Sequence, residues 1–311
     1  MELAKNIAVA PGIQVIVRDW LNANHVLIRG NAESVVIDTG YGAHAQQTLA
    51  LICAEDALGS RRLDRVVNTH CHSDHMGGNA ALARAFGCPV SLPEYAARLV
   101  DAWDTRELLL DYADQQAERF SYADTIAAND RLRLGDLEWQ ALAAPGHDMT
   151  ALMFYQPEHR VLVSGDALWE RGFGLIEPVD RLEERLAAQR ATLERIDELE
   201  IAAVIPGHGA PFRAADKALA EAFRRLAAYE ADPLKLARHC LKSFFMFALL
   251  ARRSMKRREL PGYFERVLCY REYNAQFFRR PAGELAEMVT GELLRSGAVI
   301  EHDGTLAPAS S

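Results

Sequence analysis

The sequence predicts an α/β fold in which helices flank packed sheets, and three observations support it. Short β-rich runs alternate with helical segments in two similar series. The chain has 311 residues, half of them apolar, which suffices for one large domain or for a large domain and a small one. Several β-rich runs end in a polar residue beside glycine, and glycine lets another part of the backbone come close.

The first series combines strands with two helices and ends in a long helical segment. Branched apolar runs broken by Gly30 and Asn31 predict strands, and longer runs without breakers predict helices. The predicted strands are 13–17, 24–28, 34–37, 65–68 and 88–91, and the predicted helices are 43–58 and 76–86. Residues 94–118 are helical in composition but long for a simple connection, so we expect an insertion at about 94–122, a candidate lid.

The second series has two hairpins, a helix and a last strand. Polar turn residues at Gly135-Asp136 and at 156–159 separate paired β-rich runs. The predicted hairpins are 131–134 with 137–143 and 151–155 with 160–164, followed by a helix at 180–199 and a strand at 202–205.

The chain beyond Pro211 is mostly helical and differs in charge from the rest. From Glu221 to the end there are 15 Lys and Arg against 11 Asp and Glu, so this part carries +4 and the remainder −12 of a net −8. A helix at 282–294 and two short strands around Asp303-Gly304 have the outline of a winged helix. We therefore predict a domain 1–220 and a helical, winged-helix-like domain 221–311.

The segment after the strand at 65–68 is rich in metal-binding groups. Three of the chain's 10 histidines and one aspartate fall within six residues: His70, His72, Asp74 and His75. Imidazole nitrogen and carboxylate oxygen suit zinc and similar transition metals. Alternation puts His70 and His72 on one side, with Cys71 on the other, and a turn lets Asp74 and His75 face a second centre. A histidine-rich solvated loop is the alternative interpretation.

Three later segments share one design, an apolar strand followed by a ligand-type residue beside glycine. They are Ala144-Pro145-Gly146-His147, Val163-Ser164-Gly165-Asp166 and Ile205-Pro206-Gly207-His208. Each alone is typical of an ordinary turn, but together with the first cluster they indicate a metal site.

The combined pattern resembles the metallo-β-lactamase superfamily over residues 10 to 215. Its HxHxDH signature is similar to the segment from His70 to His75, and the later ligands match at His147, Asp166 and His208. The resemblance implies a four-layer αββα sandwich with a mostly helical C-terminal extension. It also implies two divalent metal ions held at one sheet edge, zinc by default, with iron or manganese as alternatives.

The resemblance also assigns roles to these residues. The first metal site is implied to consist of His70, His72 and His147, and the second of Asp74, His75 and His208. Asp166 is implied to bridge both, and Asp38 matches an acid that orients ligands from behind. A bridging hydroxide would attack the substrate, and Asp74 is expected to orient it and take its proton.

Two residues differ from those of particular branches of the superfamily, and these differences narrow the expected substrate class. Asp166 stands where true β-lactamases of this fold often have cysteine, which favours the glyoxalase II and lactonase branches and a small thioester, lactone or other ester-like substrate. His72 stands where the flavodiiron branch has glutamate. Three alternatives stay open: a winged-helix-tailed ribonuclease or phosphodiesterase, a mono-iron persulfide dioxygenase, and a non-enzymatic ligand sensor.

Aromatic and basic residues outside the motif have two interpretations each. Trp103, Tyr112, Phe120 and Tyr122 either line an apolar pocket or pack the insertion onto the sandwich, whereas Trp169 and Phe173 are expected beside the metals. The basic run at 252–258 is either a solvated helix face or a site for an anion or nucleic acid.

Compartment and partners follow from composition. Five scattered cysteines without a CxxC pair give no sign of a disulfide framework, residues 1–12 lack an apolar signal run, and 244–250 is too short to span a membrane. We expect a cytoplasmic protein that acts on a small molecule, as a monomer or homodimer, with nucleic acid as the less favoured partner.

Overall fold

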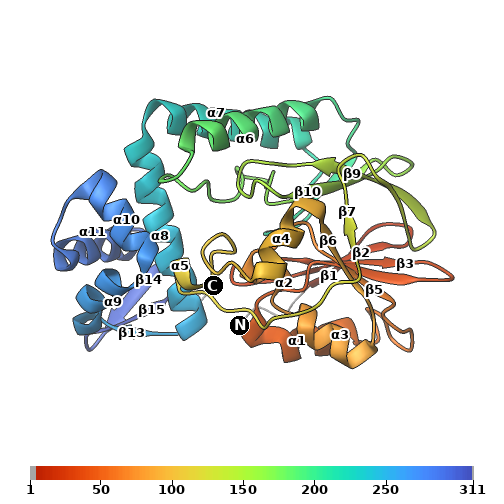
Figure 1. The fold of residues 1–311 in the computed structure, drawn as a ribbon, viewed down its shortest axis with the longest axis horizontal. Helices are drawn as coiled ribbons and strands as arrows, with labels where there is room; N and C mark the ends of the chain where they lie inside the picture. Colours follow the sequence, from red (N-terminus) through yellow and green to blue (C-terminus); the bar gives the residue numbers. More distant parts are fainter. Residues whose placement is uncertain (1–4, 310–311) are drawn as a thin grey trace.

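The computed structural model describes residues 5–309, so the outermost residues of the two predicted domains and residues 1–4 of the N-terminal segment lie outside it. Its centre is a pair of stacked sheets (Figure 1). The seven-stranded sheet has the order β1 (Lys5–Ala10), β2 (Ile13–Val17), β3 (His25–Arg29), β4 (Ser34–Ile37), β5 (Arg65–Val67), β6 (Val90–Pro93) and β7 (Asp124–Ile126). The five-stranded sheet has the order β12 (Ala203–Pro206), β11 (Val161–Gly165), β10 (Leu152–Gln156), β9 (Leu137–Ala143) and β8 (Arg131–Leu134).

Helices cover the outer face of each sheet, so the predicted αββα sandwich is confirmed. The seven-stranded sheet is covered by α1 (Ala45–Ile52), which follows a short 3-10 turn at Gly42–His44, and by α3 (Asn79–Phe86). The five-stranded sheet is covered by α6 (Leu182–Asp197) and α7 (Ala215–Ala231). Because both faces are covered, every residue of β10, β11 and β12 is buried.

The core between the sheets is built from alternate strand residues. Trp139 and Phe154 of one sheet meet Ile13, Ile28 and neighbouring branched residues of the other, and all four of these side chains are at most 1% exposed. Such packing of two inner faces is what joins the sheets.

Two features at the edge of the fold differ from the sequence predictions. The edge strands β1 and β7 were not predicted: β1 has no fully buried residue, although Ile7 and Val9 pack against the core, and two of the three residues of β7 are exposed. The insertion is not one long helix: α4 (Glu94–Ala102) ends where Trp103 adopts φ 51°, and only α5 (Leu110–Ala113) follows. The Asp104 Oδ1 accepts hydrogen bonds from the backbone N–H groups of Arg106 and Glu107, each at 3.1 Å, which holds the turn that breaks the helix.

The C-terminal part is mostly helical, as the sequence predicts, and its winged-helix character stays a prediction. Its helices are α8 (Pro233–Arg252), α9 (Leu260–Arg266), α10 (Leu268–Tyr273) and α11 (Ala282–Arg295). Its strands β13 (Met255–Lys256), β14 (Val299–His302) and β15 (Thr305–Pro308) form a sheet of order β13-β15-β14. Along the chain, helix α8 is followed by strand β13, the three helices α9, α10 and α11, and the hairpin of β14 and β15.

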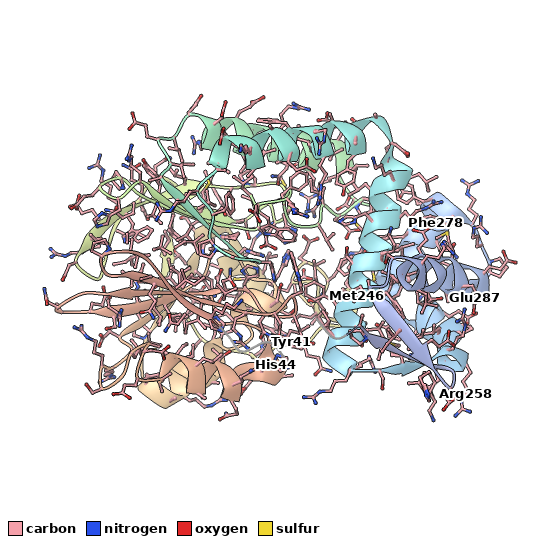
Figure 2. All side chains as sticks on the ribbon, turned by 180° about the vertical axis from the view of Figure 1, so that it is seen from behind. Tyr41, His44, Met246, Arg258, Phe278 and Glu287 are labelled. Carbon is pink, nitrogen blue, oxygen red and sulfur yellow. The ribbon has the colours of Figure 1, made fainter. Side chains whose placement is uncertain are left out.

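This part shares a continuous core with the sandwich. Leu162 and Val204 of the five-stranded sheet belong to the same buried cluster as Phe245 of α8 and Tyr270 of α10. Figure 2 shows Met246 of α8 close to α11, which carries Glu287. Met246 and Phe278, the last residue of the helical turn Asn274–Phe278, both pack against this cluster. The division at residue 220 stays a prediction, and α7 runs through it.

Within residues 5–309, none of the helices combines the length and apolar character that crossing a bilayer requires.

Replacing Phe245 by alanine tests how closely the core is packed in the C-terminal part. Phe245 is fully buried and its ring lies 5.7 Å from that of Phe264. The cavity should lower the free energy of unfolding by about 3–5 kcal/mol, measured by urea denaturation. Ile300→Ala, at a side chain that is 52% exposed, is the control and should change it by less than about 0.5 kcal/mol. A Phe245→Ala effect as small as that of the control would contradict close packing around Phe245.

Candidate metal centre

The ligand-type residues converge because the strands that precede them run in the same direction. His70 and His72 follow β5, His147 follows β9, Asp166 follows β11 and His208 follows β12. β11 and β12 pair in parallel, and β9 has the same direction through two antiparallel steps. Their side chains form three overlapping groups, in each of which the ligand atoms lie within 4.8 Å of one another: His70, His72 and His147; His70, His75 and Asp166; Asp74, His75 and His208.

The first group brings one nitrogen of each of three imidazoles close together. The Nδ1–H of His147 donates to the carbonyl oxygen of Leu175, so its Nε2 carries a lone pair. This Nε2 lies 2.9 Å from Nδ1 of His72. Thr69 Oγ1 donates to Asp38 at 2.8 Å and accepts from His70 Nδ1 at 3.0 Å, which leaves the buried Nε2 of His70 without a partner.

The second group is arranged in the same way. His75 Nδ1 donates to Asp38 Oδ2 at 2.8 Å, and its buried Nε2 has no hydrogen-bond partner. Asp74 Oδ2 lies 3.1 Å from His208 Nε2 and 3.9 Å from His75 Nε2. The Asp74 carboxylate and both imidazoles therefore face a common point.

Asp166 lies between the two groups. Its Oδ1 is 3.4 Å from His75 Nε2 and 3.9 Å from His208 Nε2, whereas its Oδ2 is 3.4 Å from His147 Nε2. One oxygen thus faces each group, as a bridging carboxylate requires.

The residues present fit a pair of divalent cations. His147 Nε2 and His72 Nδ1, two atoms that can ligate a metal, lie 2.9 Å apart, and the buried Nε2 atoms of His70 and His75 have no hydrogen-bond partner that a cation would replace. Burial lowers the pKa of His70 well below its usual value and that of His72 to about 4, so both imidazoles are neutral, as metal ligands must be. Burial acts to lower the pKa of His75 too, but the surrounding carboxylates, Asp38 first, raise it well above its usual value, which reflects an excess of buried negative charge.

Asp38 contacts residues of both ligand groups through hydrogen bonds. Its oxygens accept hydrogen bonds from the Thr69 N–H at 2.9 Å, the Thr69 hydroxyl and His75 Nδ1. It stands at the end of β4 with φ 60°, a left-handed conformation that aspartate tolerates better than most residues. It therefore fixes the rotation of His75 and, through Thr69, of His70.

Some contributors were not found from the sequence. Asp148 Oδ2 lies 3.7 Å from His72 Nε2, on the side of the ring away from His147, and the carboxylate is also held by the Thr150 N–H and hydroxyl. Its position next to His147 was the available signal. Trp20 stacks on His208 with a centroid distance of 5.5 Å and an interplanar angle of 8°, although it lies 188 residues away in the chain, so no local pattern indicates it.

The aromatic predictions are resolved one by one. Trp169 lies beside the centre, because its Nε1–H donates to Asp166 Oδ1 at 3.1 Å. Phe173 instead packs in the core against Tyr229. Tyr112 lines the pocket over the centre, whereas Trp103, Phe120 and Tyr122 pack the insertion onto the sandwich. Cys71 lies in that packing cluster, on the face away from the histidines.

The centre opens into a pocket with walls from every part of the fold. The insertion contributes Leu99, Leu109 and Tyr112, and the C-terminal part contributes Phe244, Phe247 and Tyr273. Four arginines also line it: Arg98, Arg106, Arg181 and Arg185.

With this geometry, the comparison with known proteins identifies the family. The family profile described as "Metallo-beta-lactamase superfamily" matches residues 18–208, and the chain belongs to this superfamily. The predicted superfamily is therefore confirmed, and the proteins similar to this chain include hydrolases.

Its similarity to individual proteins is more distant. The acyl-coenzyme A thioesterase MBLAC2 of Gallus gallus is 26% identical over 205 residues, which cover 60% of this chain and 72% of that protein. A hydroxyacylglutathione hydrolase of Idiomarina loihiensis is 29% identical over 140 residues, 45% of this chain and 44% of that protein, so the match spans less than half its length. The crystal structure of a metallo-beta-lactamase family protein from Thermus thermophilus has a TM-score of 0.59 at 22% identity, over 97% of this chain and 100% of that one, and shares the fold.

Gly207→Ala tests how tightly the centre is packed. A Cβ atom at Gly207 would collide with Asp166 Oδ1 and lie 2.9 Å from His75 Cε1. Displacing either group should weaken metal binding about tenfold or more, measured by competition with a chromophoric chelator. Gly283→Ala is the control, because its Cβ would meet nothing closer than 3.8 Å. Equal metal affinity in both variants would show that the centre is not closely packed there.

Proposed function

We propose that this protein is a dinuclear-metal-dependent hydrolase of thioesters. The observation that carries the proposal is the pair of ligand groups that share Asp166 and face one pocket. We assign His70, His72 and His147 to the first ion and Asp74, His75 and His208 to the second, with Asp166 between them. Zinc is the proposed metal, because imidazole and carboxylate groups suit it and hydrolysis requires no redox change.

Water is the proposed nucleophile. Among the described residues that line the pocket there is no serine or cysteine. Bound divalent ions would lower the pKa of a water molecule from about 15.7 toward neutrality. Asp74 directs Oδ2 toward His208, and we propose that its Oδ1 takes the proton from the attacking water.

Aromatic side chains line the pocket beside His208, where the acyl group of a substrate would fit. Trp20, Trp169 and Phe247 surround the ring of His208, with ring centroids 5.5, 5.4 and 6.5 Å away. Such an aromatic wall beside the ligand groups suits the apolar part of an acyl substrate.

The pocket also offers positive charge for an anionic carrier. Arg106 is paired with Glu272, and Arg181 with Asp180 and Glu107. Arg98 and Arg185 form no ion pair within residues 5–309, and Arg185 donates to the carbonyl oxygen of Asp180. Guanidinium groups without a carboxylate partner bind carboxylates and phosphates, so an acyl thioester of an anionic carrier fits better than a neutral ester. The similarity to an acyl-coenzyme A thioesterase and to hydroxyacylglutathione hydrolases supports the same choice.

A substrate panel tests the reaction. The zinc-loaded protein should hydrolyse an acyl-coenzyme A or hydroxyacylglutathione thioester, and turnover should be lost with a chelator and return with zinc. A lactone and an RNA phosphodiester complete the panel. Turnover of the phosphodiester alone would overturn the proposal in favour of the nuclease alternative, and no turnover at all would contradict hydrolysis.

The ligand assignment has its own test. Asp166→Ala and His147→Ala should each lose most of the bound metal together with activity, measured by elemental analysis and by the thioester assay. His302→Ala is the matched control, because His302 is exposed at the end of β14. Metal retained at the wild-type ratio in both ligand variants would refute the assignment.

A further inference from the structure

One short loop, residues 174–177, connects the ligand groups with the far wall of the pocket. At its start, the Gly174 N–H donates to the carbonyl oxygen of Asp166 at 2.8 Å. The next carbonyl, that of Leu175, accepts from His147 Nδ1. The Ile176 carbonyl accepts from the thiol of Cys240 on α8 at 3.3 Å. Consecutive residues thus contact two ligand-type residues and the C-terminal part.

Glu177 ends this loop and joins two further elements. Its Oε1 accepts from the Tyr112 hydroxyl of α5 at 2.9 Å, and its Oε2 accepts from the Tyr273 hydroxyl of α10 at 2.7 Å. Tyr112 is 3% exposed and Tyr273 is fully buried, and all three residues line the pocket. Burial raises the pKa of Glu177, and the two hydroxyls oppose that shift by binding the charged form.

A second carboxylate, that of Glu272, also connects the insertion to the C-terminal helices. Glu272 of α10 lies 3.1 Å from the Tyr112 hydroxyl, so it competes with Glu177 for the single proton of that group, and it pairs with both terminal nitrogens of Arg106 at 2.9 and 2.8 Å. The Arg106 guanidinium lies 4.6 Å from the centroid of the Tyr112 ring. The insertion is therefore held to α10 by several charged contacts that converge on Tyr112.

We propose that Glu177 is a positioning residue, which holds the insertion and the C-terminal helices as one wall of the substrate pocket at a fixed place relative to His147. The inference rests on the proposed function, which supplies the thioester substrate. It adds to that function a role for Glu177, acting through the insertion and the C-terminal helices. Only one residue separates Glu177 from Leu175, so a shift of the tyrosines is resisted at the same loop that orients His147.

The physical reason lies in the two buried hydroxyls. Without the carboxylate, Tyr112 keeps Glu272 as an acceptor, but Tyr273 has no other acceptor for its hydroxyl within the described chain. A buried hydroxyl without a partner is costly, so Tyr273 must move or admit water. A displacement of about 1 Å in a substrate-positioning wall can reduce turnover by about 100-fold.

The experiment compares Glu177→Ala, Glu177→Gln and Tyr273→Phe with wild type. Tyr122→Phe is the matched control, since Tyr122 donates to Asp101 at 3.0 Å on the insertion but does not line the pocket. Zinc per chain, kcat and KM for a thioester that wild type hydrolyses, and hydrogen exchange of residues 106–118 and 268–278 are measured for each variant.

Glu177→Ala should keep the wild-type zinc content, lose about tenfold or more in kcat/KM and exchange faster in both segments. Glu177→Gln should recover most of this loss because its amide oxygen still accepts one hydroxyl. Tyr122→Phe should match wild type. If Glu177→Ala does not fold, Glu177→Gln and Tyr273→Phe carry the test, with smaller losses in the same direction.

An unchanged kcat/KM in Glu177→Ala, or a loss that only follows lost zinc, would overturn the inference. Failure of the proposed function looks different: wild type itself would hydrolyse no thioester. In that case hydrogen exchange decides. Faster exchange of residues 106–118 and 268–278 in Glu177→Ala would support the positioning role of Glu177, and unchanged exchange would overturn it.

Discussion

The structure depends on one electrostatic constraint: buried carboxylates and imidazole nitrogens crowd together at one edge of the sheets, where bound cations would satisfy them. Asp38, Asp74 and Asp166 are each at most 7% exposed, and the bare nitrogens of His70 and His75 point into the same space. Burying such groups without a partner carries a large free-energy cost. The strands that end at this edge, and the glycines that let them approach, are arranged around that requirement.

Helical parts of the chain turn this centre into a pocket for a particular kind of substrate. The sandwich supplies the ligand groups, but Tyr112 of the insertion and Phe247 and Tyr273 of the C-terminal part supply walls. Because that C-terminal part shares its core with the sandwich, it acts as part of the site. Two arginines of its basic run are paired with carboxylates of this chain: Arg252 with Asp114 of the insertion, and Arg257 with Glu287 and Glu301.

The ligand-type residues were predictable because each one has a local signal, an apolar strand that ends in a polar residue beside glycine. Asp38 was found for the same reason. Trp20 and Glu177 were not, since their partners lie far along the chain and meet them only after folding. The break after α4 was missed because composition does not reveal that Trp103 adopts a left-handed conformation. The edge strand β1 was missed although Ile7 and Val9 alternate beside the core, and β7, with three residues, is too short to show an alternation.

The most direct test of the account is the metal content of the wild-type protein, purified without added chelator and measured by elemental analysis. We predict two divalent ions per chain, chiefly zinc, because two groups of ligand atoms share Asp166. A single iron per chain, or a folded protein that binds no divalent ion when supplied with zinc, would contradict the account.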